Sequence, residues 1–576
     1  MKKLIIGLIF CFTLALLPTC ALVGCGNGTK ENATAGKKYA VTFVFDENHR
    51  SVSLVASGKK AKEPIKMTKA GYAFDAWYID EAKTQLYDFS KAVKKNITLY
   101  ARLYDNKISL STTDSNAYVS GIKANSVSVT IPEVFNGKSV TEIGRNAFVN
   151  SSLQVLTIPN SVTKIGENAF KNCTDLISIT IGNGVTQIYP YAFAGCTNLN
   201  NVIIPNSVTT ISKYAFFGCT SLSNVIFGNQ LEIIEQGAFK NCLGIRSINI
   251  PAKVSNIGDF AFLGCQNLES ITVSAQNTIY DSRENCNAII KSNTVMIGCK
   301  NTTFPQSVIA ICEYAFKGCT GLVEIEIPST IKFIGHSAFA DCNNLESITV
   351  PFIGNGQCDI PNARYYDALS DYWKYNVRYG YTSEYDSRCY SNSYMFYSIF
   401  GYLKQYSYTF QTAAVIPESL KNVTVTGGKI TDSAFYGAKN IESITITNSA
   451  TKVGSAAFVG CSALVNLLLP STITEFEDGA FGSCTSLTSI TIADNVNNIG
   501  GWTFLNCTSL ETVIIKNADV YSFVGSGFDS SCVLDYATNV YVLKSIDNAS
   551  NNCLNSNYTK ASGTGDYSDY YIYTRN

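Results

Sequence analysis

Histidine, methionine and tryptophan are scarce in this chain of 576 residues, which has 2 His, 4 Met and 3 Trp. With two imidazoles in the whole sequence, catalysis by a histidine base and metal sites rich in histidine are disfavoured. An excess of positive charge is also lacking, because Lys+Arg and Asp+Glu both number 44. Nucleic acid binding requires a basic surface that neutralises phosphates. We therefore expect no nucleic-acid partner.

Long hydrophobic runs are missing as well, apart from one near the N-terminus. Residues 4–17 form an apolar run that follows Lys2 and Lys3. This run is shorter than a transmembrane helix, which needs about 20 apolar residues. A charged start followed by a short apolar run is instead typical of a targeting segment.

The end of this segment, Leu22-Val23-Gly24-Cys25, resembles the lipobox of bacterial lipoprotein precursors. The resemblance implies that residues 1–24 are a signal peptide and that Cys25 carries a diacylglycerol. Residues 25–37 would then be the lipidated cysteine and a flexible polar tether. An ordinary secretory signal with an incidental cysteine is the alternative. We expect a bacterial cell-surface protein that is held to a membrane through its N-terminal lipid.

Residues 38–104 differ from the rest of the chain. Tyr39 to Phe45 alternates as a strand does, and the motifs GYAFDAWY (71–78), YDF (87–89) and ITLYARL (97–103) follow. This order resembles the internalin B-repeat, also called the Listeria–Bacteroides repeat, although the usual glycine pair after the first strand is replaced by DENHR. The resemblance implies a small β-grasp domain. We expect Phe74 and Trp77 in its core, and the domain to act as a spacer.

From about residue 108 a single pattern recurs, V-x-x-I-G-x-x-A-F-x-x-C-x-x-L-x-x-I-x-I-P. A fixed period of about 23 residues indicates stacked units, each too small to bury its own apolar face. The interval from Phe262 to Phe316 is more than twice this period and fits one additional, longer coil. The pattern places a phenylalanine at positions 148, 170, 193, 216, 239, 262, 316, 339, 435, 458, 481, 504 and 528.

Within each unit, segments such as 176–181 and 268–273 alternate as strands, and a second short strand is predicted before each Ala-Phe pair, as in 208–211. The Ala-Phe pair is predicted to form a tight turn that places the phenylalanine in the core. Ten cysteines lie three residues after such a phenylalanine, whereas Ser151 and Ala438 take the equivalent place in two coils. A position that accepts Ala, Ser or Cys requires a small buried group. Stacked thiols without CxxC spacing predict neither disulfides nor a metal site.

The repeat also resembles the BspA-like leucine-rich repeat family. Its motif SxTxIGxxAFxxCxxLxxIxIP is nearly complete from Ser161 to Pro205, and the match spans about 110–530. The resemblance implies a mainly β, right-handed solenoid of ~23-residue coils on the cell surface. We assign repeats to 105–350 and 412–535, an insert to 351–411 and a C-terminal cap to 536–576. The insert leaves open whether the solenoid is continuous.

Two sets of residues are candidate ligand contacts. The outward positions of the long strands form a mild polar face that includes Asn201, Ile203, Asn224, Ile226, Glu324 and Glu326. Ser, Thr and Ile suit any exposed strand, however, whether or not a ligand binds there.

The second set lies in the insert, where residues 365–408 contain 13 tyrosines together with tryptophan and arginine. Tyr, Trp and Arg dominate binding hot spots. A flap packed against the solenoid is the alternative, and a disulfide between Cys358 and Cys389 stays open. The candidate contacts are Tyr372, Trp373, Tyr375, Arg378, Tyr379, Tyr381 and Tyr385.

We therefore predict an adhesin-like protein that binds extracellular proteins through the solenoid face and the insert. Capture of extracellular glycans is the second hypothesis. An enzyme is the third, because the sequence has no phosphate-binding glycine loop, no HExxH and no GxSxG. We expect no cofactor. The identity of the ligand and the oligomeric state stay open.

Overall fold

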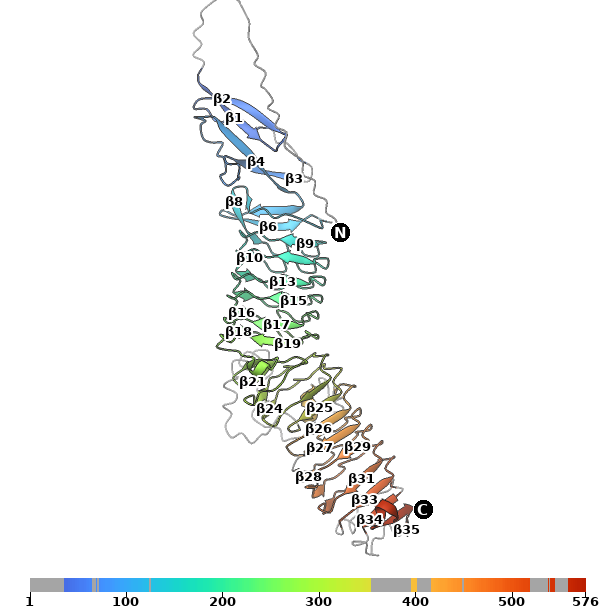
Figure 1. The fold of residues 1–576 in the computed structure, drawn as a ribbon. Helices are drawn as coiled ribbons and strands as arrows, with labels where there is room; N and C mark the ends of the chain where they lie inside the picture. Colours follow the sequence, from blue (N-terminus) through green and yellow to red (C-terminus); the bar gives the residue numbers. More distant parts are fainter. Residues whose placement is uncertain are drawn as a thin grey trace, which may run out of the picture.

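The computed structural model describes residues 36–64, 69, 72–123, 126–353, 395–400, 416–447, 450–517, 537, 539–543 and 558–576. The predictions for Cys25, Phe528, the Cys358–Cys389 pair and the seven aromatic and arginine candidates of the insert lie outside these residues. Figure 1 shows an elongated molecule with a small sheet at its N-terminal end and a long stack of coils behind it. Within the described residues, no helix has the length and apolar character that a membrane crossing requires.

The N-terminal sheet has four strands in the order β2-β1-β4-β3. Strand β1 pairs parallel with β4, and the other two pairings are antiparallel. As predicted, Trp77 is buried in the core of this sheet, where its ring contacts Phe43 edge to face. The strands are β1 (Lys38–Val44), β2 (Arg50–Ala56), β3 (Tyr72–Tyr78) and β4 (Ile97–Asp105).

The N-terminal sheet rests on the first coil of the stack through a polar contact. The Tyr78 hydroxyl donates to the Asp75 carboxylate (2.8 Å) and accepts from the backbone N–H of Gly137 (3.3 Å). The Arg102 guanidinium lies over the Tyr78 ring, 4.3 Å from its centroid, and donates to the carbonyl of Val134. Burial raises the pKa of Asp75. The predicted spacer domain is thus attached to the solenoid by specific side-chain contacts.

The rest of the chain is a mainly β solenoid, as predicted, in which each regular coil has one long and one short strand. Long strands pair in parallel with long strands and short with short, and partners lie one repeat apart, as in Val202↔Val225 and Ile211↔Ile234. The inward side chain in the middle of the three-residue long strands, such as Val202 and Val225, comes from the strand alternation of the repeat.

The long strands are β9 (Val155–Thr157), β11 (Ser178–Thr180), β13 (Asn201–Ile203), β15 (Asn224–Ile226), β17 (Ser247–Ile250), β19 (Ser270–Val273), β23 (Glu324–Glu326), β25 (Ser347–Val350), β26 (Asn422–Val425), β27 (Ser443–Ile446), β29 (Asn466–Leu468), β31 (Ser489–Ile492) and β33 (Thr512–Ile515). The short strands are β10 (Lys164–Ile165), β12 (Gln187–Ile188), β14 (Thr210–Ile211), β16 (Ile233–Ile234), β18 (Asn256–Ile257), β22 (Ala310–Ile311), β24 (Phe333–Ile334), β28 (Lys452–Val453), β30 (Glu475–Phe476) and β32 (Asn498–Ile499). In the first coil their place is taken by β8 (Lys138–Ile143), which is longer and also pairs with the strands before it.

Antiparallel strands begin and end the stack. The hairpin of β5 (Ile108–Thr112) and β6 (Ala117–Ile122) precedes β7 (Val134–Phe135), which pairs with β8. At the C-terminus β36 (Tyr570–Arg575) lies between β34 (Asn539–Leu543) and β35 (Tyr558–Ser562). The hairpin strands β20 (Ile289–Lys291) and β21 (Thr294–Ile297), two 3-10 helices, η1 (Arg283–Asn285) and η2 (Gly565–Tyr567), and the short helix α2 (Met395–Ser398) complete the described elements.

The Ala-Phe pairs form the predicted turns and stack their rings in the core. The rings of Phe148, Phe170, Phe193, Phe216 and Phe239 are fully buried, with neighbouring centroids 4.9–5.1 Å apart and nearly parallel planes. Each phenylalanine N–H donates to the alanine carbonyl of the next coil, as from Phe193 to Ala215 (2.7 Å). Continuous stacking is how units too small to fold alone acquire a common core.

Each turn requires a left-handed backbone two residues after its phenylalanine. Asn150, Asn172 and Asn241 have φ of 55° to 61° there, and Gly195 and Gly218 have φ of 75° and 69°. Asparagine and glycine adopt this conformation most readily. The Asn-Cys and Gly-Cys pairs that recur in the sequence therefore mark the end of the turn.

The cysteines of the repeat form a second buried column. The thiol of Cys196 donates to the carbonyl of Phe170, that of Cys219 to Phe193 and that of Cys242 to Phe216, each at 3.1 Å. In the first coil Ser151 takes the equivalent place, with its hydroxyl 3.3 Å from the Cys173 sulfur. All cysteines in the described ranges are free and buried, which confirms the prediction of buried thiols.

The solenoid is continuous across the insert. Strand β25 pairs in register with β26, from Ser347↔Asn422 to Val350↔Val425. The Phe339 N–H donates to the Ile399 carbonyl (2.8 Å), so Ile399-Phe400 takes the place of an Ala-Phe pair. Phe396 and Phe400 are buried between Phe339 and Phe435. The sequence pattern missed this turn, because Ile replaces Ala and no cysteine follows three residues later.

Candidate functional site

The long strands present a row of outward side chains along the stack. Asn201, Ile203, Asn224 and Ile226 are all exposed, and the two isoleucines have exposed fractions of 55% and 49%. Because β13 and β15 pair in register, Asn201 lies beside Asn224 and Ile203 beside Ile226. The Asn224 amide donates to the Asn201 side-chain oxygen (2.9 Å). The structure thus brings four of the predicted contacts together in one patch, which we call the Asn-Ile patch.

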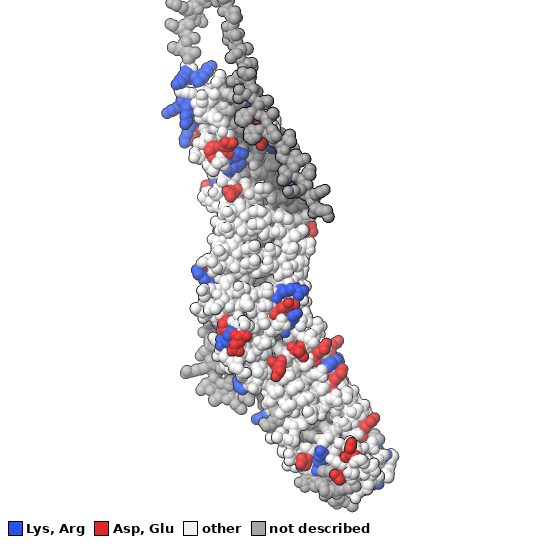
Figure 2. Space-filling view, viewed as in Figure 1, with Lys and Arg blue, Asp and Glu red and all other residues white. Residues whose placement is uncertain are grey.

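The other two strand candidates, Glu324 and Glu326, are also exposed but belong to β23. Their register partners are Ser347 and Thr349 of β25, so they lie apart from the Asn-Ile patch. The space-filling view in Figure 2 shows the surface over the first coils almost without charge, whereas acidic and basic side chains cluster farther along the stack. The predicted face therefore has an uncharged part and an acidic part.

A different feature lies at the long interval between Phe262 and Phe316, where one coil has a shortened turn. Strand β20 (Ile289–Lys291) and β21 (Thr294–Ile297) form a hairpin there, and β21 pairs with β22 through Val295↔Ile311. Cys319 follows Ile311 by eight residues, but Cys299 follows Val295 by only four. The predicted additional coil is therefore present, and its turn lacks four residues.

The missing residues include the phenylalanine. The Gly298 N–H donates to the Ala315 carbonyl (2.9 Å), as a turn phenylalanine does in regular coils. A Cβ at Gly298 would overlap the edge of the Phe316 ring, so this ring packs on the glycine itself. Phe262 stacks on Phe239 (5.5 Å) and Phe316 on Phe339 (5.0 Å). The ring column is thus interrupted between Phe262 and Phe316.

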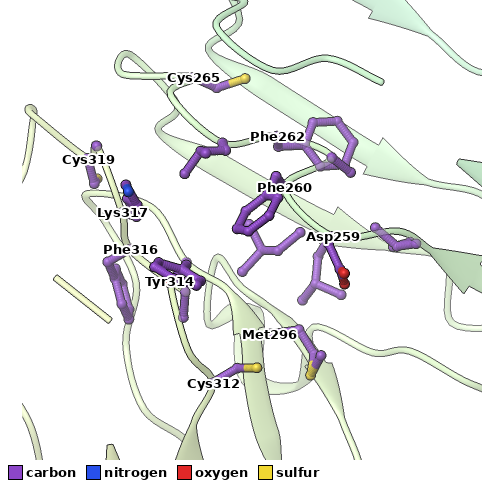
Figure 3. A pocket seen from close by; sticks show the side chains of 18 of the residues that line it. Asp259, Phe260, Phe262, Cys265, Met296, Cys312, Tyr314, Phe316, Lys317 and Cys319 are labelled. Carbon is purple, nitrogen blue, oxygen red and sulfur yellow. The ribbon is translucent and has the colours of Figure 1, made fainter. Parts of the chain in front are cut away.

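The interruption leaves a cavity of about 90 Å³ between two turns. Its walls are the turn around Phe262, the turn around Phe316 and the end of β21. Figure 3 shows the rings of Phe260 and Tyr314 approaching each other from the two turns, with Met296 on a third side. The centroids of these two rings are 5.3 Å apart. We call this space the turn cavity.

One wall of the turn cavity carries unpaired backbone donors. In the turns around Phe148, Phe170, Phe193, Phe216 and Phe239, three N–H groups donate to the following coil: that of the phenylalanine and those two residues before and after it. The corresponding groups next to the cavity belong to Phe260, Phe262 and Gly264. Among the described residues, none accepts a hydrogen bond from these three N–H groups. A donor without a partner costs free energy unless water or a ligand satisfies it.

The cavity is acidic at one end, where one carboxylate comes from each of the two turns. Asp259 and Glu313 lie three residues before Phe262 and Phe316, and both line the cavity. Burial and the nearby Glu313 carboxylate raise the pKa of Asp259. Burial also raises the pKa of Tyr314 to about 12. Within the described ranges, no three His, Cys, Asp or Glu side chains form a group suited to a metal ion.

The turn cavity was not predicted from the sequence. The interval from Phe262 to Phe316 predicts one longer coil, but the incomplete turn of that coil was missed. The sequence does show that this coil lacks an Ala-Phe pair, because Val295-Met296 stands in the place that the pair takes before Cys299, but it does not show that a cavity results.

A two-strand coil with a buried Leu, Cys and Phe in most turns of the stack defines a leucine-rich repeat solenoid. The chain matches the BspA type Leucine rich repeat region over residues 98–205, 186–297, 295–355 and 428–559, which together cover more than half of its length. The chain belongs to this family. Residues 39–102 match the Listeria-Bacteroides repeat domain. Both resemblances inferred from the sequence are confirmed.

Solved structures of bacterial leucine-rich repeat proteins are similar to the chain. One is a leucine-rich repeat protein from Bacteroides ovatus, which is 23% identical; the alignment covers 74% of this chain and 97% of that protein, with a TM-score of 0.45. A leucine rich cell surface protein from Faecalibacterium prausnitzii is 22% identical; the alignment covers 76% of this chain and 93% of that protein, with a TM-score of 0.32. The pneumococcal vaccine antigen PcpA is 19% identical, with 72% and 87% covered and a TM-score of 0.38. No curated protein matches the chain.

Proposed function

We propose that this protein acts on the bacterial cell surface and binds extracellular proteins through the outward face of its long strands, as an adhesin does. Membership in the BspA-type leucine-rich repeat family supports a binding role. The observation that carries the proposal is the Asn-Ile patch, where amides and exposed aliphatic groups alternate on a rigid, uncharged surface. Such a surface buries apolar area and pairs amides without the cost of desolvating charges.

A binding assay with the full chain tests this proposal. Matrix proteins and a glycan array are the two sets of probes, because capture of glycans is the competing hypothesis. The variant Ile203→Glu with Ile226→Glu places two charges in the Asn-Ile patch and is expected to weaken protein binding at least about tenfold. Leu505→Glu is a matched control, since Leu505 is an exposed aliphatic residue on a turn of a distant coil. Binding to glycans alone, or equal binding by both variants, contradicts the proposal.

The tyrosine-rich insert is proposed as a second contact region, through Tyr372, Trp373, Tyr375, Arg378, Tyr379, Tyr381 and Tyr385. A deletion that tests it has to keep residues 395–400, because Phe396, Ile399 and Phe400 are buried in the solenoid. Removing residues 361–392 meets this requirement. Loss of binding with an unchanged melting temperature supports the insert as a contact region, and unchanged binding excludes it.

The lipid anchor at Cys25 is likewise a proposal, which rests on the lipobox resemblance. Cells that produce the protein and receive an alkyne-labelled fatty acid are expected to label the wild-type chain but not Cys25→Ala. Equal labelling of both chains, or of neither, contradicts the anchor.

A further inference from the structure

The outer edge of the N-terminal sheet is an open β-strand. Strand β2 comes first in the order β2-β1-β4-β3, and it pairs with β1 over all seven of its residues without a bulge. Within the described residues, no other strand pairs with β2. Figure 1 shows β2 at the end of the molecule that points away from the solenoid, whereas β3 lies next to the first coil. The far edge of β2 is therefore available to a partner.

The backbone groups on this edge can be assigned from the pairing with β1. The Phe45 N–H donates to the His49 carbonyl (2.9 Å), so these two residues form a hydrogen-bonded pair. Hydrogen-bonded and non-hydrogen-bonded pairs alternate along an antiparallel ladder, and the register between β1 and β2 is unbroken. The odd-numbered residues of β2 therefore bond to β1. The N–H and C=O groups of Arg50, Val52 and Leu54 point to the far edge, where they are a template for another strand.

The side chains of β2 leave this edge unprotected. Edge strands are usually protected from pairing by lysine, proline or a bulge, and β35 at the edge of the C-terminal sheet carries Lys560 at its centre. The only charged residue of β2 is Arg50, at its first position. Val52 and Leu54 are 63% and 68% exposed, the largest exposed fractions of any described Val, Leu or Ile. The edge is thus apolar, which favours pairing with a second strand.

The charges that flank β2 fit a second copy of the same strand. Asp46 and Glu47 precede β2, whereas Lys59 and Lys60 follow it. Glu47 and Lys59 are exposed and lie six residues before and six residues after Ser53. When two copies pair antiparallel around a twofold axis at Ser53, Lys59 of each copy faces Glu47 of the other. Opposite charges therefore meet at both ends of the paired strands.

The same register also matches the outward backbone groups. It sets Val52 of each copy opposite Leu54 of the other, and two such residues exchange two hydrogen bonds. Their side chains lie on one face of the joined sheets, so the aliphatic groups of both copies meet across the axis. The Arg50 residues of the two copies stay about 20 Å apart, the length of six strand residues. No pair of like charges opposes this register.

We propose that β2 is a dimerisation surface, at which two copies of this chain join their N-terminal sheets by antiparallel pairing around a twofold axis at Ser53. Backbone hydrogen bonds of Val52 and Leu54 hold the copies together, and Lys59 with Glu47 fixes the register. One strand from each copy makes a small interface, so the dimer is reversible. Because β2 lies at the end of the molecule, the two copies are arranged end to end. The dimer does not use the Asn-Ile patch.

Two cysteine variants of the full chain test the register. Ser53 lies opposite itself in a non-hydrogen-bonded pair, where the Cα atoms are about 4.5 Å apart and a disulfide is allowed. In the same register Ser51 lies opposite Val55 of the second copy, so the two substituted positions are about 13 Å apart. Under mild oxidation Ser53→Cys should form covalent dimers at least about tenfold faster than Ser51→Cys. The wild-type chain corrects for its own cysteines. Equal rates for the two variants, or no covalent dimer of Ser53→Cys, overturn the proposal.

Sedimentation of the full chain tests the surface itself. Val52→Lys with Leu54→Lys places like charges across the axis and should raise the dissociation constant of the dimer at least about tenfold. Val465→Lys with Leu468→Lys is the matched control, since these two residues are exposed on a distant coil. Equal melting temperatures of both variants show that the fold is kept. A wild-type chain that stays monomeric up to about 0.1 mM overturns the proposal, even if it captures an extended peptide. A dimer that persists in the β2 variant also overturns it.

A charge exchange gives an independent test of the flanking contacts. Lys59→Glu sets two glutamates against each other and should weaken the dimer about threefold, as expected for an exposed ion pair. Lys59→Glu combined with Glu47→Lys restores opposite charges and should recover the wild-type dissociation constant. If the double variant dimerises no better than Lys59→Glu, these residues do not face each other and the proposed register is wrong.

Discussion

The coils from Phe148 to Phe239 and the coils around Phe262 and Phe316 have the same turns but a different environment. In the first group the rings from Phe170 to Phe239 each stack on a ring of the coil before and a ring of the coil after. Every turn of this group also donates three backbone hydrogen bonds to the next coil. Around the turn cavity one ring contact and three hydrogen bonds are lost because a single coil is four residues too short. A repeat solenoid depends on contacts between neighbours, so a local deletion creates a local site without disturbing the coils beyond it.

The largest expected effect compares two phenylalanines of the column. Phe193→Ala removes a ring that stacks on two neighbours and should destabilise the protein by about 3–5 kcal/mol. Phe262→Ala removes a ring with one stacked neighbour, Phe239. Its cost should be smaller by about 0.5–1.5 kcal/mol, the contribution of one aromatic pair. Urea unfolding of both variants measures the difference, and a larger loss for Phe262→Ala contradicts the comparison.

The cysteine column should show a smaller difference. The Cys219 thiol donates to the Phe193 carbonyl, whereas among described residues none accepts a hydrogen bond from the Cys319 thiol beside the cavity. Cys219→Ala should therefore cost about 0.5–1.5 kcal/mol more than Cys319→Ala, which is the net value of one hydrogen bond. Urea unfolding of the two alanine variants tests this difference. Equal unfolding midpoints would show that the Cys219 hydrogen bond does not contribute to stability.

The acidic end of the cavity should make stability depend weakly on pH. The pKa of Asp259 is raised in the folded protein, so the folded state holds its proton at pH values where the unfolded state, with a pKa of about 3.9, has lost it. Stability should therefore fall as the pH rises from the unfolded to the folded pKa. Because Asp259 is only half-buried, the loss should stay below about 1 kcal/mol.

Asp259→Asn provides the control for this pH effect, because the asparagine side chain does not lose a proton in this pH range. Thermal melts from pH 3.5 to 7 should show a decline in the wild-type chain that the variant lacks. A decline of the same size in both chains would assign it to other groups.

The smallest expected effect concerns the exposed face. Asn224→Ala removes the amide that donates to Asn201, both of which are exposed. Stability should change by less than about 0.5 kcal/mol, as for most surface substitutions. A thermal melt that shifts as much as for Cys219→Ala would mean that the Asn-Ile patch is structural and would weaken its assignment as a binding surface.

The sequence predicted the coils well because the repeat imposes the same physical requirement on every unit. A small residue before each phenylalanine, a small residue three positions after it and alternating strand residues recur at fixed positions of the repeat. The turns whose residues depart from this pattern were not predicted. Ile399-Phe400 completes a coil after an insertion, and Gly298 replaces a phenylalanine, so neither carries the Ala-Phe signal.

The candidate site was predictable only in part. Alternation along β13 and β15 was sufficient to predict that Asn201, Ile203, Asn224 and Ile226 face outward, since a strand in a stack has one buried and one exposed side. The unpaired N–H groups of Phe260, Phe262 and Gly264 depend on the length of the next coil rather than on their own residue types. Such a site follows only from the pairing of Val295 with Ile311 in the structure.

Amide hydrogen exchange tests the account of the stacked turns most directly. The N–H groups of Tyr214, Phe216 and Gly218 donate to the following coil, and their exchange is expected to require opening of the stack. Those of Phe260, Phe262 and Gly264 lack this hydrogen bond and should exchange at least about a hundredfold faster, which corresponds to about 2.7 kcal/mol of lost protection. Equal protection of the two sets would contradict the interrupted stack and the site built upon it.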